Sequence, residues 1–327
     1  MRWPLIKFLP EKTNFRFVAV ARLFAALSVL AVIASLAGTF LPFQPPCGGL
    51  NCGVDFRGGT VLEVTTAPRG ADLGTIRSTL NRLNLGDVQV QEFGRPSDAL
   101  VRYEVPPGQS AAATVQRARA ELELALPGLR VQRNETVSAR VSNELLTNGV
   151  MALGIAIVLM LLYIWFRFGL TFGVGAVVAL FHDVILTFGL FAFTRLEFSL
   201  VTVAAVLTII GYSMNDTVVV LDRIRENLRK YKKMPLGELI DLSVNETLSR
   251  TVITGFTGLM ALTGLAVFGG EALFAFSVAM IFGIIVGTYS SIFVAAPVLL
   301  LLGVRRGEKD DAEPLPVPGQ RREVARP

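Results

Sequence analysis

Residues 210–227 read IGYSMNDTVVVLDRIREN, an apolar run that contains the carboxylate of Asp216 and passes directly into a basic cluster. An ionisable residue deep in a membrane helix costs roughly 2.5 to 3.5 kcal/mol on insertion scales. Such residues therefore usually face the interior of a helix bundle and often lie on an ion or proton path. The stretch predicts a membrane helix with a functional carboxylate.

The composition supports a membrane protein. Hydrophobic residues make up 52% of the 327 residues and charged residues only 17%, which is too apolar for an ordinary soluble protein. A helix needs about 20 apolar residues to cross the hydrocarbon of a bilayer. Six runs reach that length and predict a polytopic α-helical membrane protein with six transmembrane helices: 18–41, 147–166, 170–192, 198–221, 251–268 and 273–302.

Basic residues set the orientation of these spans. Residues 1–16 carry four Lys and Arg against one Glu, and residues 222–233 carry six against two acidic residues. Short flanks enriched in Lys and Arg stay in the cytoplasm, which puts both termini inside and residues 44–142 outside. The first apolar run is longer than a signal-peptide core and is predicted to stay as an anchor. The net charge of +5 thus reflects topology and contact with lipids, not a nucleic-acid surface.

This topology divides the chain into five parts. They are a cytoplasmic N-terminus at 1–17, a first transmembrane helix at 18–43, a periplasmic domain at 44–142, a five-helix membrane region at 143–303 with an amphipathic cytoplasmic segment at 222–249, and a disordered cytoplasmic tail at 304–327.

The external domain shows two kinds of periodicity. Alternating residues predict strands and helical spacing predicts helices in the order βαββαβ, typical of a ferredoxin-like α+β domain. The strands are predicted at 60–66, 87–93, 99–105 and 129–137, and the helices at 71–84 and 110–126. The domain contains no histidine, nucleophile elbow or phosphate-binding loop, which indicates a binding or moving module rather than an enzyme.

Two features mark the entry to this domain. Cys47 and Cys52 are the only cysteines of the chain, and they either form a local disulfide or remain two free thiols; a second ligand pair for zinc is missing. In residues 53–60, GVDFRGGT, the glycines Gly58 and Gly59 predict a tight turn into the first strand. The charged side chains beside them, Asp55 and Arg57, are interpreted as contacts that orient the domain.

Three groups of charges in the membrane region each allow two interpretations. Asp216, with Asn215 beside it, either handles protons or holds helices together by hydrogen bonds. A neutral polar side chain would hold helices together without the cost of burying a charge. Arg250 pairs with Asp216 or reaches back to the interface as an anchor. His182 and Asp183, near the middle of the third predicted span, are a second relay station or a satisfied polar pair.

Glycine spacing adds a prediction about packing. Gly169 and Gly173, and again Gly283 and Gly287, are four residues apart, a spacing that lets membrane helices approach closely. Both pairs are therefore expected to lie on packing faces.

Five stretches together resemble the SecF family of subunits of the bacterial Sec protein-export machinery, within the resistance-nodulation-division superfamily. They are GVDFRGGT (53–60), HDV (182–184), IGYSMNDTVVVLDRIREN (210–227), NETLSRT (245–251) and GTYSSIFVA (287–295). The resemblance covers almost the whole chain and follows the family's order and spacing. By it, Asp216 and Arg250 match the family's membrane aspartate and arginine.

The resemblance implies an inner-membrane protein without enzymatic activity or cofactor. It implies a heterodimer with SecD that assists the SecYEG channel in translocating SecA-dependent preproteins by using the proton motive force, with YajC and YidC as further partners. Two alternatives stay open. One is a half-transporter of small molecules or lipids from the same superfamily, and the other is a passive assembly subunit in which Asp216 and Arg250 only lock two helices.

Overall fold

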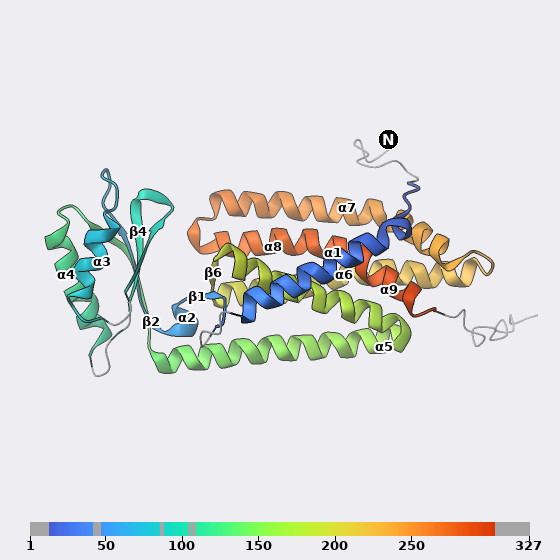
Figure 1. Ribbon diagram of the computed structural model, residues 1–327, viewed down its shortest axis with the longest axis horizontal. Helices are drawn as coiled ribbons and strands as arrows, with labels where there is room; N and C mark the ends of the chain where they lie inside the picture. The colour runs from blue at the N-terminus through green and yellow to red at the C-terminus, as the bar shows by residue number, and fades with distance from the viewer. Residues whose placement is uncertain (1–12, 42–46, 86–87, 104, 106–108, 305–327) are drawn as a thin grey trace, which may run out of the picture.

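The structure is a computed structural model that describes residues 13–41, 47–85, 88–103, 105 and 109–304. It consists of an elongated helix bundle with an α/β domain at one end (Figure 1). Most of the predicted N-terminal segment 1–17 and nearly all of the predicted tail 304–327 lie outside the described residues.

The α/β domain is a four-stranded sheet with two helices. The strands follow the order β3-β4-β2-β5, and each neighbouring pair is antiparallel. Along β2, Leu62 and Val64 face the helices, whereas Val61 packs on the opposite side against Leu100. The elements are β2 (Gly59–Thr65), α3 (Leu73–Asn81), β3 (Gln89–Phe93), β4 (Arg95–Tyr103), α4 (Ala111–Ala125) and β5 (Arg130–Val137).

The bundle contains, within the described residues, five helices long and apolar enough to cross a membrane. The last of the five is continued past a π turn, η1, by a short helix, α9. The elements are α1 (Phe17–Phe40), α5 (Ala139–Thr194), α6 (Leu200–Lys230), α7 (Leu236–Phe268), α8 (Glu271–Ser290), η1 (Ser291–Ala295) and α9 (Ala296–Leu301).

The longest helix, α5, combines two of the predicted apolar runs, 147–166 and 170–192. Gly169 interrupts it with a non-helical backbone at φ 71° and ψ −176°. A residue without a Cβ adopts this conformation at little cost. Figure 1 shows the chain turning there and running back along the bundle. Gly169 is therefore an elbow between two arms, and the expectation that it lies on a packing face is wrong.

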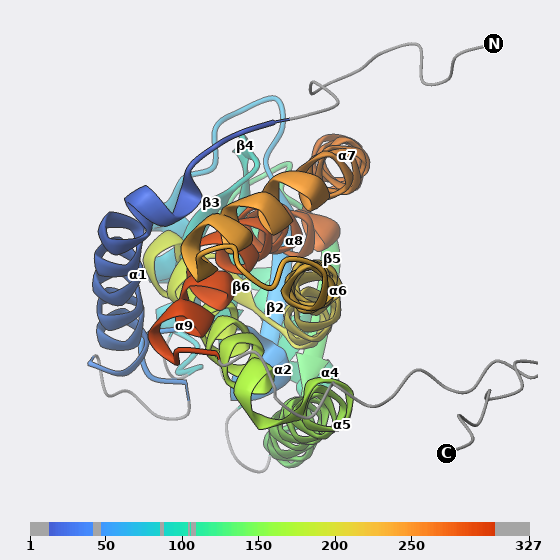
Figure 2. The same ribbon diagram turned by 90° about the vertical axis from the view of Figure 1, so that its right-hand side faces the viewer.

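The five helices differ in how deeply they are buried. In the most apolar part of α6, 44% of residues are buried, and in that of the span Leu273–Leu301, formed by α8, η1 and α9, 56% are buried; the values are 6% for α1 and 11% each for α5 and α7. The view along the bundle shows α1 and the first arm of α5 on the outside (Figure 2). Ser213 and Thr217 of α6 and Ser277 and Ser290 of α8 are among the buried residues of the bundle.

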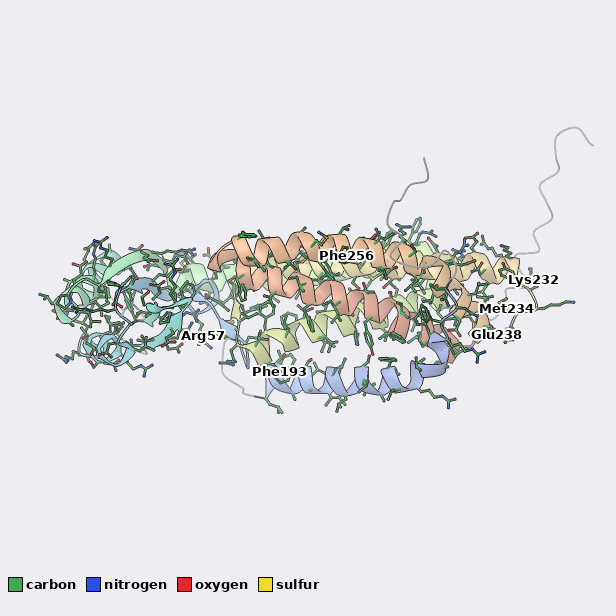
Figure 3. All side chains as sticks on the ribbon, turned by 90° about the horizontal axis from the view of Figure 1, so that it is seen from above. Arg57, Phe193, Lys232, Met234, Glu238 and Phe256 are labelled. Carbon is green, nitrogen blue, oxygen red and sulfur yellow. A yellow bond between two sulfur atoms is a disulfide. The ribbon has the colours of Figure 1, made fainter. Side chains whose placement is uncertain are left out.

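The predicted amphipathic segment 222–249 forms the end of α6 and the start of α7. Ile224 and Leu228 of α6 pack in the same apolar cluster as Leu239 and Ile240 of α7. The two apolar faces therefore pack against each other in a helical hairpin. Figure 3 shows Lys232, Met234 and Glu238 of this hairpin at the end of the bundle opposite Arg57 and the α/β domain.

Candidate functional site

Asp216 connects three elements of the bundle. Its carboxylate, on α6, accepts hydrogen bonds from Thr251 Oγ1 of α7 at 2.5 Å and from Ser291 Oγ of η1 at 2.8 Å. Hydrogen bonds to an ionised acceptor are worth roughly twice those between neutral groups. The charge on Asp216 therefore bears directly on how α7 and η1 pack against α6.

Asp216 also lines a small cavity, of ≈ 10 Å³, together with Asn215, Arg250 and Thr254. This is about the space that one water molecule needs. Among the described residues, no ion pair joins Asp216 to Arg250, so the predicted direct contact is not formed in this structure. Arg250 instead attracts the carboxylate across the cavity, since it lies close enough to act on it electrostatically.

Asp183 is the second carboxylate of the bundle core and is only 1% exposed. One oxygen, Oδ1, lies 2.8 Å from Nδ1 of His182, and the other, Oδ2, accepts from Ser290 Oγ at 2.7 Å and from Ser213 Oγ. The donors come from α5, α6 and α8. Asp183 is thus enclosed by hydrogen-bond donors, whereas Asp216 borders a cavity.

His182 extends this second centre toward α1. Its ring stacks on that of Tyr289, with 5.9 Å between centroids and an interplanar angle of 27°. The Tyr289 hydroxyl in turn lies 2.7 Å from Ser28 Oγ and donates to the carbonyl of Phe24 at 2.8 Å. The other ring nitrogen, Nε2 of His182, is buried without a hydrogen-bond partner among the described residues.

A π turn places two consecutive serines on the two carboxylates. Ser290 ends α8 and contacts Asp183, whereas Ser291 begins η1 and contacts Asp216. Pro297, at the start of α9, has no N–H for a helical bond to the carbonyl of Phe293. A local widening of the helix before such a residue is a common response, and π turns recur at functional sites.

The polar residues near Asp216 on α6 therefore divide between two centres. Ser213 points to Asp183, whereas Asn215 and Asp216 border the cavity. No role was predicted from the sequence for Thr251, Ser290 or Ser291. The signal available was a hydroxyl residue within an apolar run, but the sequence does not show which facing helix supplies its acceptor.

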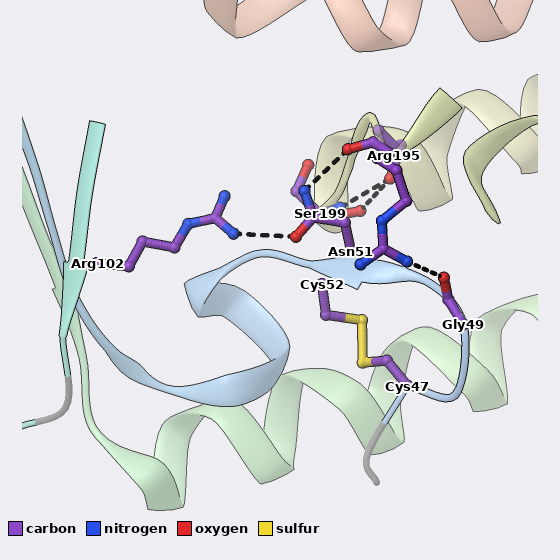
Figure 4. The surroundings of a disulfide bond; sticks show 8 residues. Cys47, Gly49, Asn51, Cys52, Arg102, Arg195 and Ser199 are labelled. Carbon is purple, nitrogen blue, oxygen red and sulfur yellow. Dashed lines mark hydrogen bonds between the residues drawn. A yellow bond between two sulfur atoms is a disulfide. The ribbon is translucent and has the colours of Figure 1, made fainter. Parts of the chain in front are cut away.

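The second region of interest joins the α/β domain to the bundle. Cys47 and Cys52 form a disulfide. The short strand β1 (Asn51–Cys52) pairs in parallel with β6 (Glu197–Phe198), which lies between α5 and α6. Figure 4 shows Arg195 of the bundle donating to the carbonyl of Gly49, at 2.7 Å. Strands of two residues carry no periodicity, so the sequence could not predict this pairing.

The residues of the entry motif have separate roles at this junction. Asp55, on the short helix α2 (Val54–Arg57), accepts from the backbone N–H of Leu200 at 2.9 Å. It thereby caps the start of α6, where a negative charge is favourable. Gly58 and Gly59 have φ values of 75° and 103°, so both need glycine, as the predicted turn requires. Arg57 is exposed.

An ion pair reinforces the same junction from the sheet. Arg102 of β4 lies 2.6 Å from Glu197 of β6 and also donates to Asn51 at 3.3 Å. A Cβ on Gly53 would lie 2.3 Å from a carboxylate oxygen of Glu197. The domain is thus connected to the start of α6 by a strand pair, an ion pair and a helix cap.

Comparisons with known proteins agree with this architecture. A family profile described as the C-terminal part of the protein export membrane proteins SecD and SecF matches residues 120–305, and one described as the SecD/SecF GG motif matches residues 49–68. The second match covers the glycine turn at the junction, and the first covers both carboxylate centres.

Curated relatives match over nearly their full length. The chain is 46% identical over 321 residues to a protein translocase subunit SecF of Rhodobacter capsulatus, with 94% of each chain covered. It is 42% identical over 310 residues to one of Cereibacter sphaeroides, covering 92% of this chain and 94% of the relative.

Solved structures of SecDF are similar as well. A crystal structure of the translocon-associated membrane protein SecDF from Thermus thermophilus matches with a TM-score of 0.79 and 35% identity, over 91% of this chain. A structure of SecDF in a super-membrane-facing form matches with a TM-score of 0.62, also at 35% identity, over 92%. The chain spans 40% of the length of each of these SecDF chains.

Together with the long apolar helices, these matches identify a multi-pass protein of the inner membrane that acts in protein export and is not an enzyme. The chain belongs to the SecF branch of the SecD/SecF family of protein-export membrane proteins.

Proposed function

We propose that this chain pairs with SecD and uses the proton motive force to assist SecYEG- and SecA-dependent translocation of preproteins across the inner membrane. The observation that carries the proposal is Asp216, a membrane carboxylate that connects α6 to α7 and η1 and borders a cavity with Arg250. The relatives of this chain are named protein translocase subunits, which supports a role in the same process.

Proton uptake at Asp216 would change the packing of three elements at once. A charged acceptor forms hydrogen bonds worth about 1.5 to 3 kcal/mol, whereas a neutral one forms bonds of about 0.5 to 1.5 kcal/mol. Protonation also removes the attraction to Arg250 across the cavity. The donors Thr251 and Ser291 are then held less tightly, and α7 and η1 gain freedom to move against α6.

His182 and Asp183 are proposed to support this centre from α5. Ser290 and Ser291 are adjacent, so a shift of Ser291 on protonation of Asp216 acts on the contact between Ser290 and Asp183. A strong hydrogen bond from Ser290 to Asp183 would resist the movement of η1, whereas a weak one would let the movement reach Asp183.

The proposed topology has six crossings, with the two arms of α5 crossing separately on either side of Gly169. Residues 44–142 then form a ferredoxin-like periplasmic domain, consistent with the strand order β3-β4-β2-β5, and both termini are cytoplasmic. Movement at the bundle reaches this domain through Asp55, which caps α6, and through the glycine turn behind it.

The test is the substitution Asp216→Asn. The variant keeps the size of the side chain and one of its two acceptor oxygens but holds no titratable proton. We expect normal accumulation and association with SecD, with loss of the stimulation of preprotein export by a proton gradient in membrane vesicles. Glu238→Gln is the matched control, because it makes the same chemical change at an exposed position of α7.

Either outcome is informative. Loss of stimulation in Asp216→Asn alone, in an assembled complex, supports proton coupling through this carboxylate. Full stimulation in Asp216→Asn would contradict it and favour the passive assembly role, in which the hydrogen bonds of Asp216 only hold helices together.

A further inference from the structure

We propose that the elbow of α5 and the end of α6 form a binding site for the headgroup of an anionic phospholipid. The two elements border an open cavity of ≈ 570 Å³, lined among the described residues by four basic and two acidic side chains. The lining residues are Arg167, Asp222, Arg225, Glu226, Arg229 and Lys230. The excess of two positive charges suits an anion.

Both acidic side chains already have arginine partners. Asp222 forms an ion pair with Arg167, which connects the elbow to α6. Glu226 accepts from Arg223, a residue next to the cavity, at 2.6 Å. Arg225 and Arg229 are four residues apart on α6, so they lie on one face of the helix. A phosphate between them would meet donors whose planar geometry suits bidentate binding.

The position of the cavity indicates that the phosphate belongs to a lipid. Trp165 and Phe166, just before Arg167, are 60% and 93% exposed, and Leu170, just after the elbow, is 75% exposed. Exposed aromatic residues beside basic ones mark the level of the lipid headgroups. Acyl chains attached to a bound phosphate would therefore cover Phe166 and Leu170, which a free phosphate would leave uncovered.

The site lies far from the α/β domain. Figure 1 shows the elbow of α5 at the opposite end of the bundle, beside the end of α6. Basic pockets between helices at such an interface bind anionic headgroups in other membrane proteins. The proposal does not depend on proton coupling, since none of the six lining residues belongs to either carboxylate centre.

The chain provides its own reporter for a test. Its two tryptophans are Trp3 and Trp165, so Trp3→Phe leaves a single fluorophore two residues from Arg167. The full chain carrying Trp3→Phe is reconstituted in vesicles containing increasing fractions of brominated phosphatidylglycerol or brominated phosphatidylcholine. We expect half-maximal quenching of Trp165 at a lower fraction of the anionic lipid.

Two double variants, each made on Trp3→Phe, separate the site from general attraction. Arg225→Gln with Arg229→Gln removes two lining charges, and the preference should fall by roughly fivefold for each arginine lost. Lys232→Gln with Lys233→Gln removes the same charge from residues of the same hairpin that do not line the cavity, and should keep most of the preference. Arg225→Lys with Arg229→Lys retains the charge and should keep the preference in part.

Three results would overturn the proposal. Equal quenching by the two lipids in Trp3→Phe would show that no preference exists. Equal loss in the two glutamine double variants would show general attraction without a site. Abolition of the preference by millimolar glycerol phosphate in solution would identify a site for a free phosphate ester and not for a lipid.

Discussion

Asp183 and Asp216 are both carboxylates that receive hydrogen bonds from several helices of the bundle, but their surroundings differ. Asp183 is 1% exposed and receives hydrogen bonds from neighbours on α5, α6 and α8. Asp216 is only partly buried, has two hydroxyl donors and borders a cavity with Arg250. A buried carboxylate whose oxygens all have hydrogen-bond donors, such as Asp183, suits a fixed structural role. A carboxylate beside a water-sized cavity, such as Asp216, suits exchange of a proton.

The difference shows how one helix bundle can hold a fixed polar centre beside a changeable one. Ser213 and Asp216 lie three residues apart on α6, so both centres share a helix face. They also share the π turn, where Ser290 and Ser291 separate toward the two carboxylates. Under the proposed function, the fixed centre would position the turn, so that protonation of Asp216 would alter only the contacts beyond it.

The largest predicted effect is on stability at the fixed centre. Asp183→Ala removes the acceptor of three buried groups, and we expect a loss of about 2–4 kcal/mol in the free energy of unfolding. Asp216→Ala leaves two donors beside a cavity that water can enter, and should cost about 1 kcal/mol. Thermal unfolding in detergent, followed by circular dichroism, compares the two; equal losses would contradict the distinction.

The sequence predicted much of this architecture because periodicity and length carry the information. The side chains of β2 alternate between the two faces of the sheet, with Leu62 and Val64 on one face and Val61 on the other. The apolar runs correspond to the helices of the bundle. The break between the runs 147–166 and 170–192 was predicted, but Gly169 was assigned to a packing face, because its spacing of four residues from Gly173 is also typical of such a face. The sequence also singled out Asp216 through its desolvation cost.

The surroundings of the carboxylates could not be predicted in the same way. The sequence suggested a direct pair of Asp216 with Arg250, but Thr251 and Ser291 are its hydrogen-bond donors in the structure. The partner of a buried carboxylate depends on which helices touch and at what rotation. Those relations involve residues up to 107 positions apart along the chain, and no local pattern encodes them.

An intermediate effect is expected from the close contact that supports the fixed centre. A Cβ on Gly287 would lie 2.9 Å from the Cβ of Ser213, so Gly287→Ala should push Ser213 away from Asp183. We expect a loss of about 1–2 kcal/mol, in the range of overpacked cores. The measurement is again the thermal midpoint in detergent.

Gly264→Ala provides the matched control for that substitution. Gly264 lies within α7, and a Cβ there would meet nothing within 4 Å. The same change should therefore be neutral or stabilise the helix by up to about 1 kcal/mol, because alanine favours helix more than glycine. If Gly287→Ala is equally harmless, the contact does not constrain the Asp183 centre.

Among the substitutions at the fixed centre, His182→Phe has the smallest predicted change in stability. The substitution loses the contact between Nδ1 and Asp183 but removes a buried ring nitrogen, Nε2, that has no partner among the described residues. It also keeps a ring of similar size to stack on Tyr289. The terms offset each other, and we expect a change within about 1 kcal/mol, measured by thermal unfolding.

Because its stability is nearly unchanged, His182→Phe separates a structural histidine from one that carries protons. Phenylalanine holds no exchangeable proton at this position, so a relay through His182 would fail in a fully folded variant. If His182 belongs to the fixed centre, gradient-stimulated export in vesicles stays within about twofold of the parent, a change smaller than 1 kcal/mol in the barrier. A tenfold loss of gradient-stimulated export in the folded variant would instead assign His182 to proton transfer. Asp183 would then belong to the proton path through its contact with the His182 ring.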